Sequence, residues 1–360
     1  MNAKQLIVSV AALSAFLSVV DSTDAYTISA KKWSSNSMTM NVHIASFPAN
    51  SALRSSLNIV ERRFAMNPSQ FWIQHNWNYT STPSLTNTVS EVWFASRSVV
   101  GAPAKTTITW TTADNVIVRA DVVFANDEPY TTSMNKTSLW PYGGTGRPFE
   151  TTALHEYGHV AGLGHEADEY NIMGQDWTHI QCNGQNARSY LGADASAGLM
   201  ALYGRDSTAS IEDVSATVFR YAAADGEYST HRMCDVKTIT GTVMTGPLFN
   251  GQPRYSVNKG SSYQFEYTLE NSGELARSVQ VRFYLSSDSI IQTTDRLLYT
   301  VSSLVPIGLS NVKEFEAPLL IPANLVSGST HYVGVIVDSN NALLEVEENN
   351  NAAYHIIRVN

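Results

Sequence analysis

Three histidines and one glutamate between residues 155 and 165 have the types and the spacing of a metal site with a catalytic base. His155 and His159 are four residues apart, so on an α-helix both imidazoles leave the same face and can bind one metal ion. Glu156 then lies beside the metal without binding it. Gly162 tolerates a positive φ angle and can end the helix, which lets the chain return His165 as a third nitrogen ligand. Three neutral imidazoles with one open position are typical of a catalytic zinc site.

Zinc at this site would lower the pKa of a bound water, and Glu156 is placed to take the proton and later to deliver it to a leaving amine. The sequence therefore predicts a zinc-dependent hydrolase. The alternative is a catalytically idle, zinc-bearing adhesion or matrix-binding protein. The intact Glu156 argues against it, because a protein that only binds has no need of the base. His179 is a further histidine, but three ligands complete a catalytic set, so we expect it at the surface or in a hydrogen bond.

Met173 follows His165 by eight residues, within Asn171-Ile172-Met173-Gly174. At this distance it resembles the Met-turn that underlies the metal in metzincin proteases. The short spacing, with Gly-Leu-Gly between the second and third histidines, is closest to the matrixin branch. The resemblance implies an α+β catalytic domain with a mixed twisted sheet and a zinc-binding helix, and a zinc endopeptidase that hydrolyses peptide bonds of extracellular proteins.

Two positions depart from that pattern. Glu166 directly follows the third histidine, where animal matrixins usually carry a small hydroxyl residue, and Gln175 stands where astacins and serralysins have an additional tyrosine ligand. Of two roles for Glu166, a salt bridge to a new amino terminus or a solvent-exposed position, we expect the second. No cysteine precedes His155, so the inhibitory thiolate that animal matrixins commonly place on the zinc is excluded.

The segment between residues 26 and 124 is typical of a mixed sheet with one helix. Met38, Met40 and Val42 alternate with polar residues, as in a half-buried strand. Apolar residues recur at helical spacing over 53–64, between Pro48 and Pro68. Further strands are predicted over 71–77, 91–94, 106–110 and 116–124. This order of elements is similar to that of matrixin catalytic domains.

Residues 126–150 are rich in Gly, Pro, Thr and Ser, which predicts an extended edge followed by a loop over the cleft. In metzincins the substrate lies as an additional strand along such an edge. Residues 128–137 are our candidate for it, with an ordinary surface loop as the equal alternative. Asp121 and Asp127 flank this region and could hold a structural Ca²⁺. No complete set of oxygen ligands is visible, so solvated acids are expected.

The rest of the chain predicts a second, all-β part. A helix over 195–203 resembles the closing helix of matrixin catalytic domains, which places the catalytic domain at 26–205 and a connector with some strands at 206–250. Over 251–360, strands such as 265–269, 279–285 and 332–337 alternate with turns, as in a β-sandwich. These strands and their turns resemble a CARDB-type immunoglobulin-like module, expected to bind matrix, cell surface or carbohydrate. A chain that ends between Arg205 and Asn250 is expected still to cut short peptides.

Composition agrees with a globular protein of two domains. The chain has 360 residues, of which 43% are hydrophobic and 15% charged. Its net charge of -9, without a cluster of lysine and arginine, argues against nucleic acid as a partner. We expect the partner to be a protein or peptide substrate.

Residues 1–25 have the features of a signal peptide, with Lys4, an apolar run over 6–20, and small residues at Thr23-Asp24-Ala25. The run is shorter than the ~20 residues that a spanning helix needs, and no later run is long enough. We therefore expect an exported, extracellular protein without a membrane span. In an oxidising compartment its only cysteines, Cys182 and Cys234, are expected to form one disulfide, with two unpaired buried thiols as the alternative.

Overall fold

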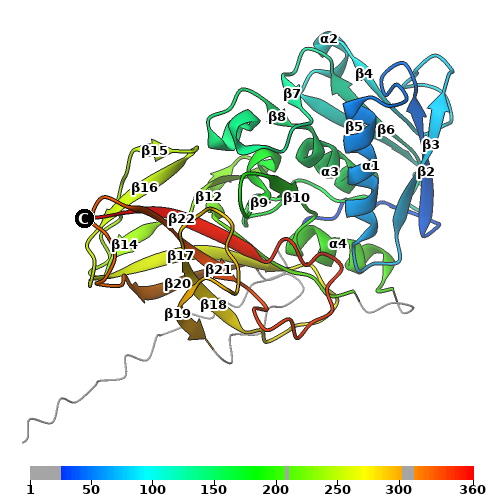
Figure 1. Ribbon diagram of the computed structural model, residues 1–360. Helices are drawn as coiled ribbons and strands as arrows, with labels where there is room; N and C mark the ends of the chain where they lie inside the picture. Colours follow the sequence, from blue (N-terminus) through cyan, green and yellow to red (C-terminus); the bar gives the residue numbers. More distant parts are fainter. Residues whose placement is uncertain (1–25, 207–210, 302–311) are drawn as a thin grey trace, which may run out of the picture.

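The computed structural model describes residues 26–206, 211–301 and 312–360. The predicted signal peptide lies outside these residues. The described chain forms a mixed α/β part, which holds the histidine motif, and a part made of β-strands that ends at the C-terminus (Figure 1). Within the described residues, no helix has the length and apolar character needed to cross a membrane.

A six-stranded sheet forms the scaffold of the α/β part. Its order is β1-β6-β4-β2-β3, and β5 pairs with β6. All pairs are parallel except β5 on β6, which is antiparallel. Since β5 pairs with no other described strand, its second edge is free. The strands are β1 (Lys32–Trp33), β2 (Ser37–His43), β3 (Trp72–Tyr79), β4 (Glu91–Ala95), β5 (Ala104–Trp110) and β6 (Val116–Ala125).

Two helices, α1 (Ala52–Ala65) and α3 (Phe149–Val160), pack on one face of this sheet (Figure 1). Ser51 caps α1 by accepting a hydrogen bond from the backbone N–H of Arg54 at 3.2 Å. Val60 and Phe64 of α1 and Tyr157 of α3 share a core with the alternating methionines of β2. The helix predicted over 53–64 and the strands predicted before it and after it are therefore confirmed. A short helix, α2 (Arg97–Val100), precedes β5.

The extended edge predicted over residues 128–137 is wrong for most of its length. Only β7 (Tyr130–Thr131) is a strand there, and it pairs in parallel with β8 (Arg147–Pro148), just before α3. The chain between them forms two 3-10 helices, η1 (Lys136–Ser138) and η2 (Trp140–Tyr142). Asn135 explains the break, because its side chain accepts from the N–H of Thr137 at 3.0 Å and starts η1.

After α3 the chain forms η3 (Asp176–Thr178), the hairpin β9 (Ile180–Cys182) and β10 (Ala187–Ser189), and α4 (Ala193–Tyr203). The helix predicted over 195–203 is thus present. Tyr203 fixes α4 to the end of α3, since its hydroxyl donates to the carbonyl oxygen of Ala161 at 2.7 Å. The closing helix therefore supports the loop that carries the third histidine.

Residues 211–250, predicted as a connector, contain five strands. Two of them, β11 (Val214–Thr217) and β14 (Val236–Thr238), pair with β17 of the C-terminal part. Between them, β12 (Phe219–Asp225) and β13 (Tyr228–Met233) form a separate antiparallel hairpin. The fifth, β15 (Leu248–Phe249), pairs with β16.

The C-terminal part consists of two sheets with a common core. One sheet has the order β11-β17-β14 with β20 on β17, and the other has the order β15-β16-β22-β21-β18-β19. Phe265 and Leu269 of β17 pack in the same core as Val333 and Val335 of β21. The strands are β16 (Gln252–Val257), β17 (Ser262–Asn271), β18 (Val281–Ser286), β19 (Arg296–Val301), β20 (Lys313–Leu320), β21 (Thr330–Ile336) and β22 (Ala352–Val359).

One hydrophobic cluster joins the two parts, beside the separate core of the α/β sheet and its helices. Tyr170 and Ile180, which come after the histidine motif, lie in the same buried cluster as Phe219 of the hairpin and the sandwich strands. A buried lysine adds a polar link. Lys136 Nζ donates to Gln252 Oε1 at 2.6 Å and to the Tyr354 hydroxyl at 2.9 Å. The α/β part is therefore not packed independently of the C-terminal part.

The two cysteines are both buried and unpaired. Cys182 Sγ lies 3.5 Å from the carbonyl oxygen of Gly184, and Cys234 Sγ lies 3.8 Å from Thr268 Oγ1. The disulfide expected between Cys182 and Cys234 is therefore absent, and the alternative of two buried thiols is the one found. Cys182 lies in β9 and Cys234 in the short link between β13 and β14, and each thiol contacts a different neighbour.

Candidate metal centre

The helix α3 and the turn after it bring three histidines together. His155 and His159 lie one turn apart on α3, and Gly162, at φ +97°, turns the chain so that His165 returns to them. The Nε2 atom of His159 is 3.1 Å from that of His155 and 3.0 Å from that of His165. Within the described ranges, these three form the one group of His, Cys, Asp or Glu residues that could hold a metal ion.

The first described residues of the chain hold this turn in place. The backbone N–H of Ser29 donates to the carbonyl oxygen of Gly162 at 2.9 Å, and Gly164 donates to that of Thr27 at 2.7 Å. A Cβ at Gly162 would collide with the carbonyl oxygen of Lys31, so the position requires glycine for space as well as for its φ angle. The loop of the third histidine is thus closed by residues far away in the sequence.

The hydrogen bonds of the three Nδ1 atoms show that the three Nε2 atoms, which face one another, carry no hydrogen. His155 Nδ1 lies 2.8 Å from the carbonyl oxygen of Ile172, and His159 Nδ1 lies 2.9 Å from that of Leu163. His165 Nδ1 lies 3.0 Å from Glu227 Oε1. Carbonyl and carboxylate oxygens only accept, so each Nδ1 carries the hydrogen and each neutral ring turns an Nε2 lone pair toward the other two.

Three converging lone pairs repel one another unless a cation lies between them. Protonation of the rings does not supply it, because burial lowers the pKa of His155 well below its usual value and that of His159 to about 4. Burial also lowers the pKa of His165, against the opposing effect of Glu227. Neutral imidazoles, each with its second nitrogen hydrogen-bonded, are the ligand form that zinc uses. The residues present therefore fit a zinc ion.

Met173 packs against α3. It is 2% exposed, and a Cβ at Gly158 would collide with its sulfur. The preceding residue, Ile172, supplies the carbonyl oxygen that orients His155. The turn thus supports the helix at Gly158 and fixes the tautomer of one histidine.

Glu156 points to the side of α3 that faces the sheet edge. The Thr106 hydroxyl of β5 lies 2.6 Å from Glu156 Oε2 and 3.0 Å from the Glu156 carbonyl oxygen. Glu156 is 5% exposed, and burial raises its pKa to about 7. A carboxyl group with this pKa can accept and return a proton near neutral pH. The sequence predicts the strand that carries Thr106 but does not indicate this contact.

The hairpin β12–β13 supplies two residues that the sequence does not place at the site. Besides the contact of Glu227 with His165, the Tyr228 ring lies 4.1 Å from the His165 ring, and 6.5 Å from the His155 ring in a stacked orientation (centroid distances). The turn Asp225-Gly226 between two strand-like runs is a hairpin signal. That signal does not say where the hairpin lies. The segment assigned as a connector thus contributes to the histidine cluster.

The base of the hairpin is hydrogen-bonded to the loop that contains Met173. Ser229 donates its N–H to the carbonyl oxygen of Glu166 at 2.7 Å and accepts from the N–H of Gln175 at 2.9 Å. The ring of His231 contacts the Thr178 hydroxyl at 3.0 Å. A Cβ at Gly174 would collide with the Ser229 hydroxyl, so the loop and the hairpin are in close contact.

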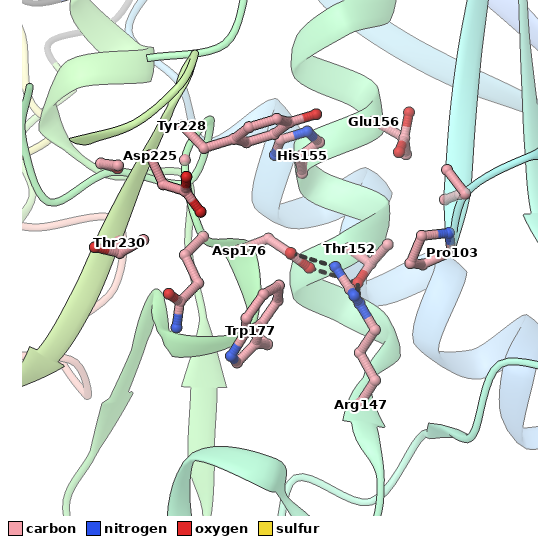
Figure 2. Close-up of a pocket in the computed structure, with 15 residues that line it drawn as sticks. Pro103, Arg147, Thr152, His155, Glu156, Asp176, Trp177, Asp225, Tyr228 and Thr230 are labelled. Carbon is pink, nitrogen blue, oxygen red and sulfur yellow. Dashed lines mark hydrogen bonds and ion pairs between the residues drawn. The ribbon is translucent and has the colours of Figure 1, made fainter. Parts of the chain in front are cut away.

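A cavity of about 290 Å³ opens beside Glu156 (Figure 2). Arg147 lies on one wall, where it donates to Asp176 Oδ1 at 2.5 Å and to Thr152 Oγ1 at 2.9 Å. Its guanidinium lies 4.7 Å from the Trp177 ring centre. The lining combines the end of β5, α3, the loop after Met173 and the hairpin: Ala102, Pro103, Ala104, Arg147, Thr152, His155, Glu156, Gly174, Gln175, Asp176, Trp177, Asp225, Tyr228, Ser229 and Thr230.

Two expectations about acidic residues are wrong. Glu166 is 4% exposed rather than solvated, because its Oε1 accepts from the N–H groups of Ala167 at 2.8 Å and Asp168 at 3.0 Å, while its Oε2 accepts from the Thr27 hydroxyl at 2.9 Å. Asp121 is fully buried and lies 3.1 Å from the Arg119 guanidinium. Burial is the largest effect on its pKa, which is raised to about 6.

The remaining candidate ligands lie away from the cluster. Asp127 pairs with Arg97 at 3.3 Å, and nothing joins it with Asp121 in a Ca²⁺ site within the described residues. His179 is buried, with Nε2 3.4 Å from Glu270 Oε1, which matches the hydrogen-bonded role expected for it. Of the residues considered as metal ligands, only the three histidines of the motif come together.

Comparison with known proteins supports both parts of the resemblance. Residues 102–204 match the Matrixin family model, and residues 249–355 match the CARDB family model. The resemblance to these two families is therefore confirmed over those residues. Neither match includes the hairpin β12–β13, which lies between them.

No curated protein sequence matches the chain significantly. A CARDB domain of Pyrococcus furiosus, determined in solution, is 17% identical with a TM-score of 0.26, over 42% of this chain and 97% of that domain. A crystal structure of that domain with di-metal ions is 16% identical, with the same TM-score, over 42% of this chain and 90% of that one. The catalytic domain of a Listeria monocytogenes LPMO is 13% identical with a TM-score of 0.19, over 30% of this chain and 58% of that one.

Proposed function

We propose that this chain, which joins a matrixin-like segment to a CARDB domain, is an exported zinc endopeptidase. The observation that carries the proposal is the group of three Nε2 atoms within 4.8 Å of one another, with a buried carboxyl group on the next residue of the same helix. The donor set fits zinc, and the position of Glu156 fits a proton carrier. His155, His159 and His165 are the proposed ligands.

Zinc held by these residues would lower the pKa of a bound water toward ~7 and polarise the carbonyl of the bond to be cut. The chain's own residues supply the remaining chemistry. Glu156 accepts a proton from the attacking water and delivers it to the leaving amine, which the raised pKa of its carboxyl group permits. The Thr106 hydroxyl orients one of its oxygens.

The free edge of β5 is the proposed site for the peptide backbone. An extended peptide can add to this edge as a further strand, because β5 pairs with β6 and with no other described strand. Since Thr106 of β5 contacts Glu156, a peptide on this edge passes close to the base. This edge replaces residues 128–137 as the candidate for substrate binding.

Two parts of the proposal rest on the sequence. Export rests on the signal-like composition of residues 1–25. For the CARDB domain we propose an accessory role in binding matrix, cell surface or carbohydrate. An idle zinc-binding protein is the less favoured alternative, because Glu156 is both present and hydrogen-bonded to Thr106 at the sheet edge.

The direct test combines metal analysis with peptide hydrolysis. Purified protein is expected to contain one zinc per chain and to cut peptides of a random library. Removal of the metal with a chelator should abolish hydrolysis, and added zinc should restore it. Hydrolysis that persists at full rate in metal-free protein, or zinc-loaded protein that cuts no peptide or protein substrate, would contradict the proposal.

A further inference from the structure

The position of Glu156 identifies which substrate residue faces the cavity. In the proposed reaction Glu156 returns its proton to the leaving amine, so the residue that carries this amine lies next to Glu156. Its side chain then lies close to the cavity of about 290 Å³ that Glu156 and His155 line. The chemistry of that cavity therefore sets the preference for the residue after the cut bond.

The one arginine or lysine on the cavity wall is already neutralised. Arg147 is 8% exposed, and its guanidinium is bound by Asp176 and Thr152. Glu128 Oε1 also lies near this guanidinium, 3.7 Å from a nitrogen of Arg147. An acidic substrate side chain would have to compete with these oxygens for a buried guanidinium, which is unfavourable.

Asp225 is the carboxylate that stays available. It is exposed on the cavity side of the hairpin (Figure 2), and its side chain has no hydrogen bond or ion pair to any described residue. The other two carboxylates of the lining are committed, Asp176 to Arg147 and Glu156 to proton transfer. A cation that enters the cavity therefore meets an unpaired negative charge.

The remaining wall suits a long hydrocarbon stem. Ala102, Pro103 and Ala104 lie at one side, and the Trp177 ring lies at another. Lysine and arginine bury their methylene groups against such surfaces and keep the charged end polar. We propose that this cavity takes a lysine or arginine side chain from the residue after the cut bond, and that Asp225 selects it. The proposal rests on the proposed endopeptidase function.

Three peptides that are identical except for this one residue test the proposal. Lysine, norleucine and glutamate differ in charge, and lysine and norleucine have similar stems. The zinc-loaded protein should cut the lysine peptide about fivefold faster, by kcat/KM, than the norleucine peptide, as expected of a partly exposed ion pair. The glutamate peptide should be slowest. The preference should shrink at high salt.

Two variants assign the preference to Asp225. Asp225→Asn should remove the difference between lysine and norleucine, and Asp225→Lys should favour the glutamate peptide. Asp127→Asn is the matched control, because it removes the same charge from an exposed aspartate that does not line the cavity. Its peptide preference should equal that of the wild type. Unfolding midpoints check that each variant is folded. Since Asp225 is exposed, we expect its substitutions to leave the midpoint unchanged.

The outcomes separate this proposal from the proposed function. Cleavage without a basic preference, or with a preference that Asp225→Asn leaves unchanged, overturns the selection by Asp225 and leaves the endopeptidase intact. Binding of the same peptides to a zinc-loaded Glu156→Gln variant, followed by fluorescence anisotropy, gives a readout independent of turnover. Equal affinity for the lysine and norleucine peptides there also overturns it. Failure to cut any peptide overturns the proposed function itself.

Discussion

The helix α3 and the hairpin β12–β13 line the same cleft, but they are built in different ways. Every residue of α3 from Phe149 to Gly158 is buried, and its reactive groups are held by packing from several sides. Residues 222–228 of the hairpin are all exposed, and the hairpin is held mainly at its base, through Ser229 and His231. Glu156 and two of the three proposed ligands, His155 and His159, thus lie on a helix that is packed from several sides.

From this difference we expect α3 to carry the residues of the reaction and the hairpin to carry those that select the peptide. A substitution on α3 disturbs a core that contains the sheet and two helices. A substitution at the hairpin tip, such as at Asp225, meets solvent and, in the proposed reaction, the substrate. The hairpin tip can therefore vary without loss of the fold, and we expect it to decide which peptides are cut.

The largest expected effect comes from removing the hairpin together with the sandwich. A chain that ends at Arg205 exposes Tyr170 and Ile180, which pack against Phe219 and the sandwich strands. It also lacks the partner of His165. We expect no cooperative unfolding transition and no hydrolysis of short peptides, in contrast to what the sequence predicts. A truncated chain that stays folded and fully active would show that the two regions are independent.

Glu156→Gln should have the next largest effect. It keeps the size of the side chain and removes the base, so hydrolysis should fall at least ~100-fold. Zinc content, measured by mass spectrometry of the metal, should stay at the wild-type value. His159→Ala is the comparison, because it should lose zinc and activity together. Wild-type hydrolysis in Glu156→Gln would mean that another group acts as base.

Glu227→Gln should weaken zinc binding about tenfold, at the lower end for a group that orients a metal ligand, because the Glu227 side chain is 70% exposed. Competition with a chromogenic chelator measures this affinity. Asp127→Asn should leave it unchanged, which excludes a general effect of charge. If Glu227→Gln binds zinc as tightly as the wild type, the hairpin does not take part in the metal centre.

The last prediction concerns stability rather than the metal centre, at the base of the hairpin and as a function of pH. Burial lowers the pKa of His231 to about 3, against ~6.5 in the unfolded chain. Below pH ~6.5 the unfolded form therefore binds a proton that the folded form does not, so stability falls as pH is lowered. Between pH 7 and pH 5 the wild type should lose about 2 kcal/mol more unfolding free energy than His231→Gln. Denaturant titration at both pH values measures this difference, and parallel losses would contradict it.

Local spacing is what made much of the molecule predictable. The positions of His155, His159, Gly162 and Met173 follow from the helical repeat and from a short turn, so their arrangement can be worked out from neighbouring residues. The same holds for the alternating strand β2 and the amphipathic helix α1. These features depend on residues within a few positions of each other.

Contacts between distant segments could not be predicted in this way. Glu227 and Tyr228 reach His165 because the hairpin packs on the loop after α3, and no local pattern encodes that packing. Glu166 was expected in solvent because its partner, Thr27, lies at the other end of the domain. The cysteines were expected to pair because sequence shows their number but not their places in the fold.

The closed loop of the third histidine has a consequence for the timing of synthesis. Residues 27–29 are synthesised long before Gly162 and Gly164, which are their hydrogen-bond partners. These hydrogen bonds can therefore form only after the two glycines have been made. The contact of His165 with Glu227 can form only after the hairpin has been made, and the cluster that joins the two parts is complete only after the last strands have been made. A growing chain thus cannot assemble the complete centre until most of its length has left the ribosome.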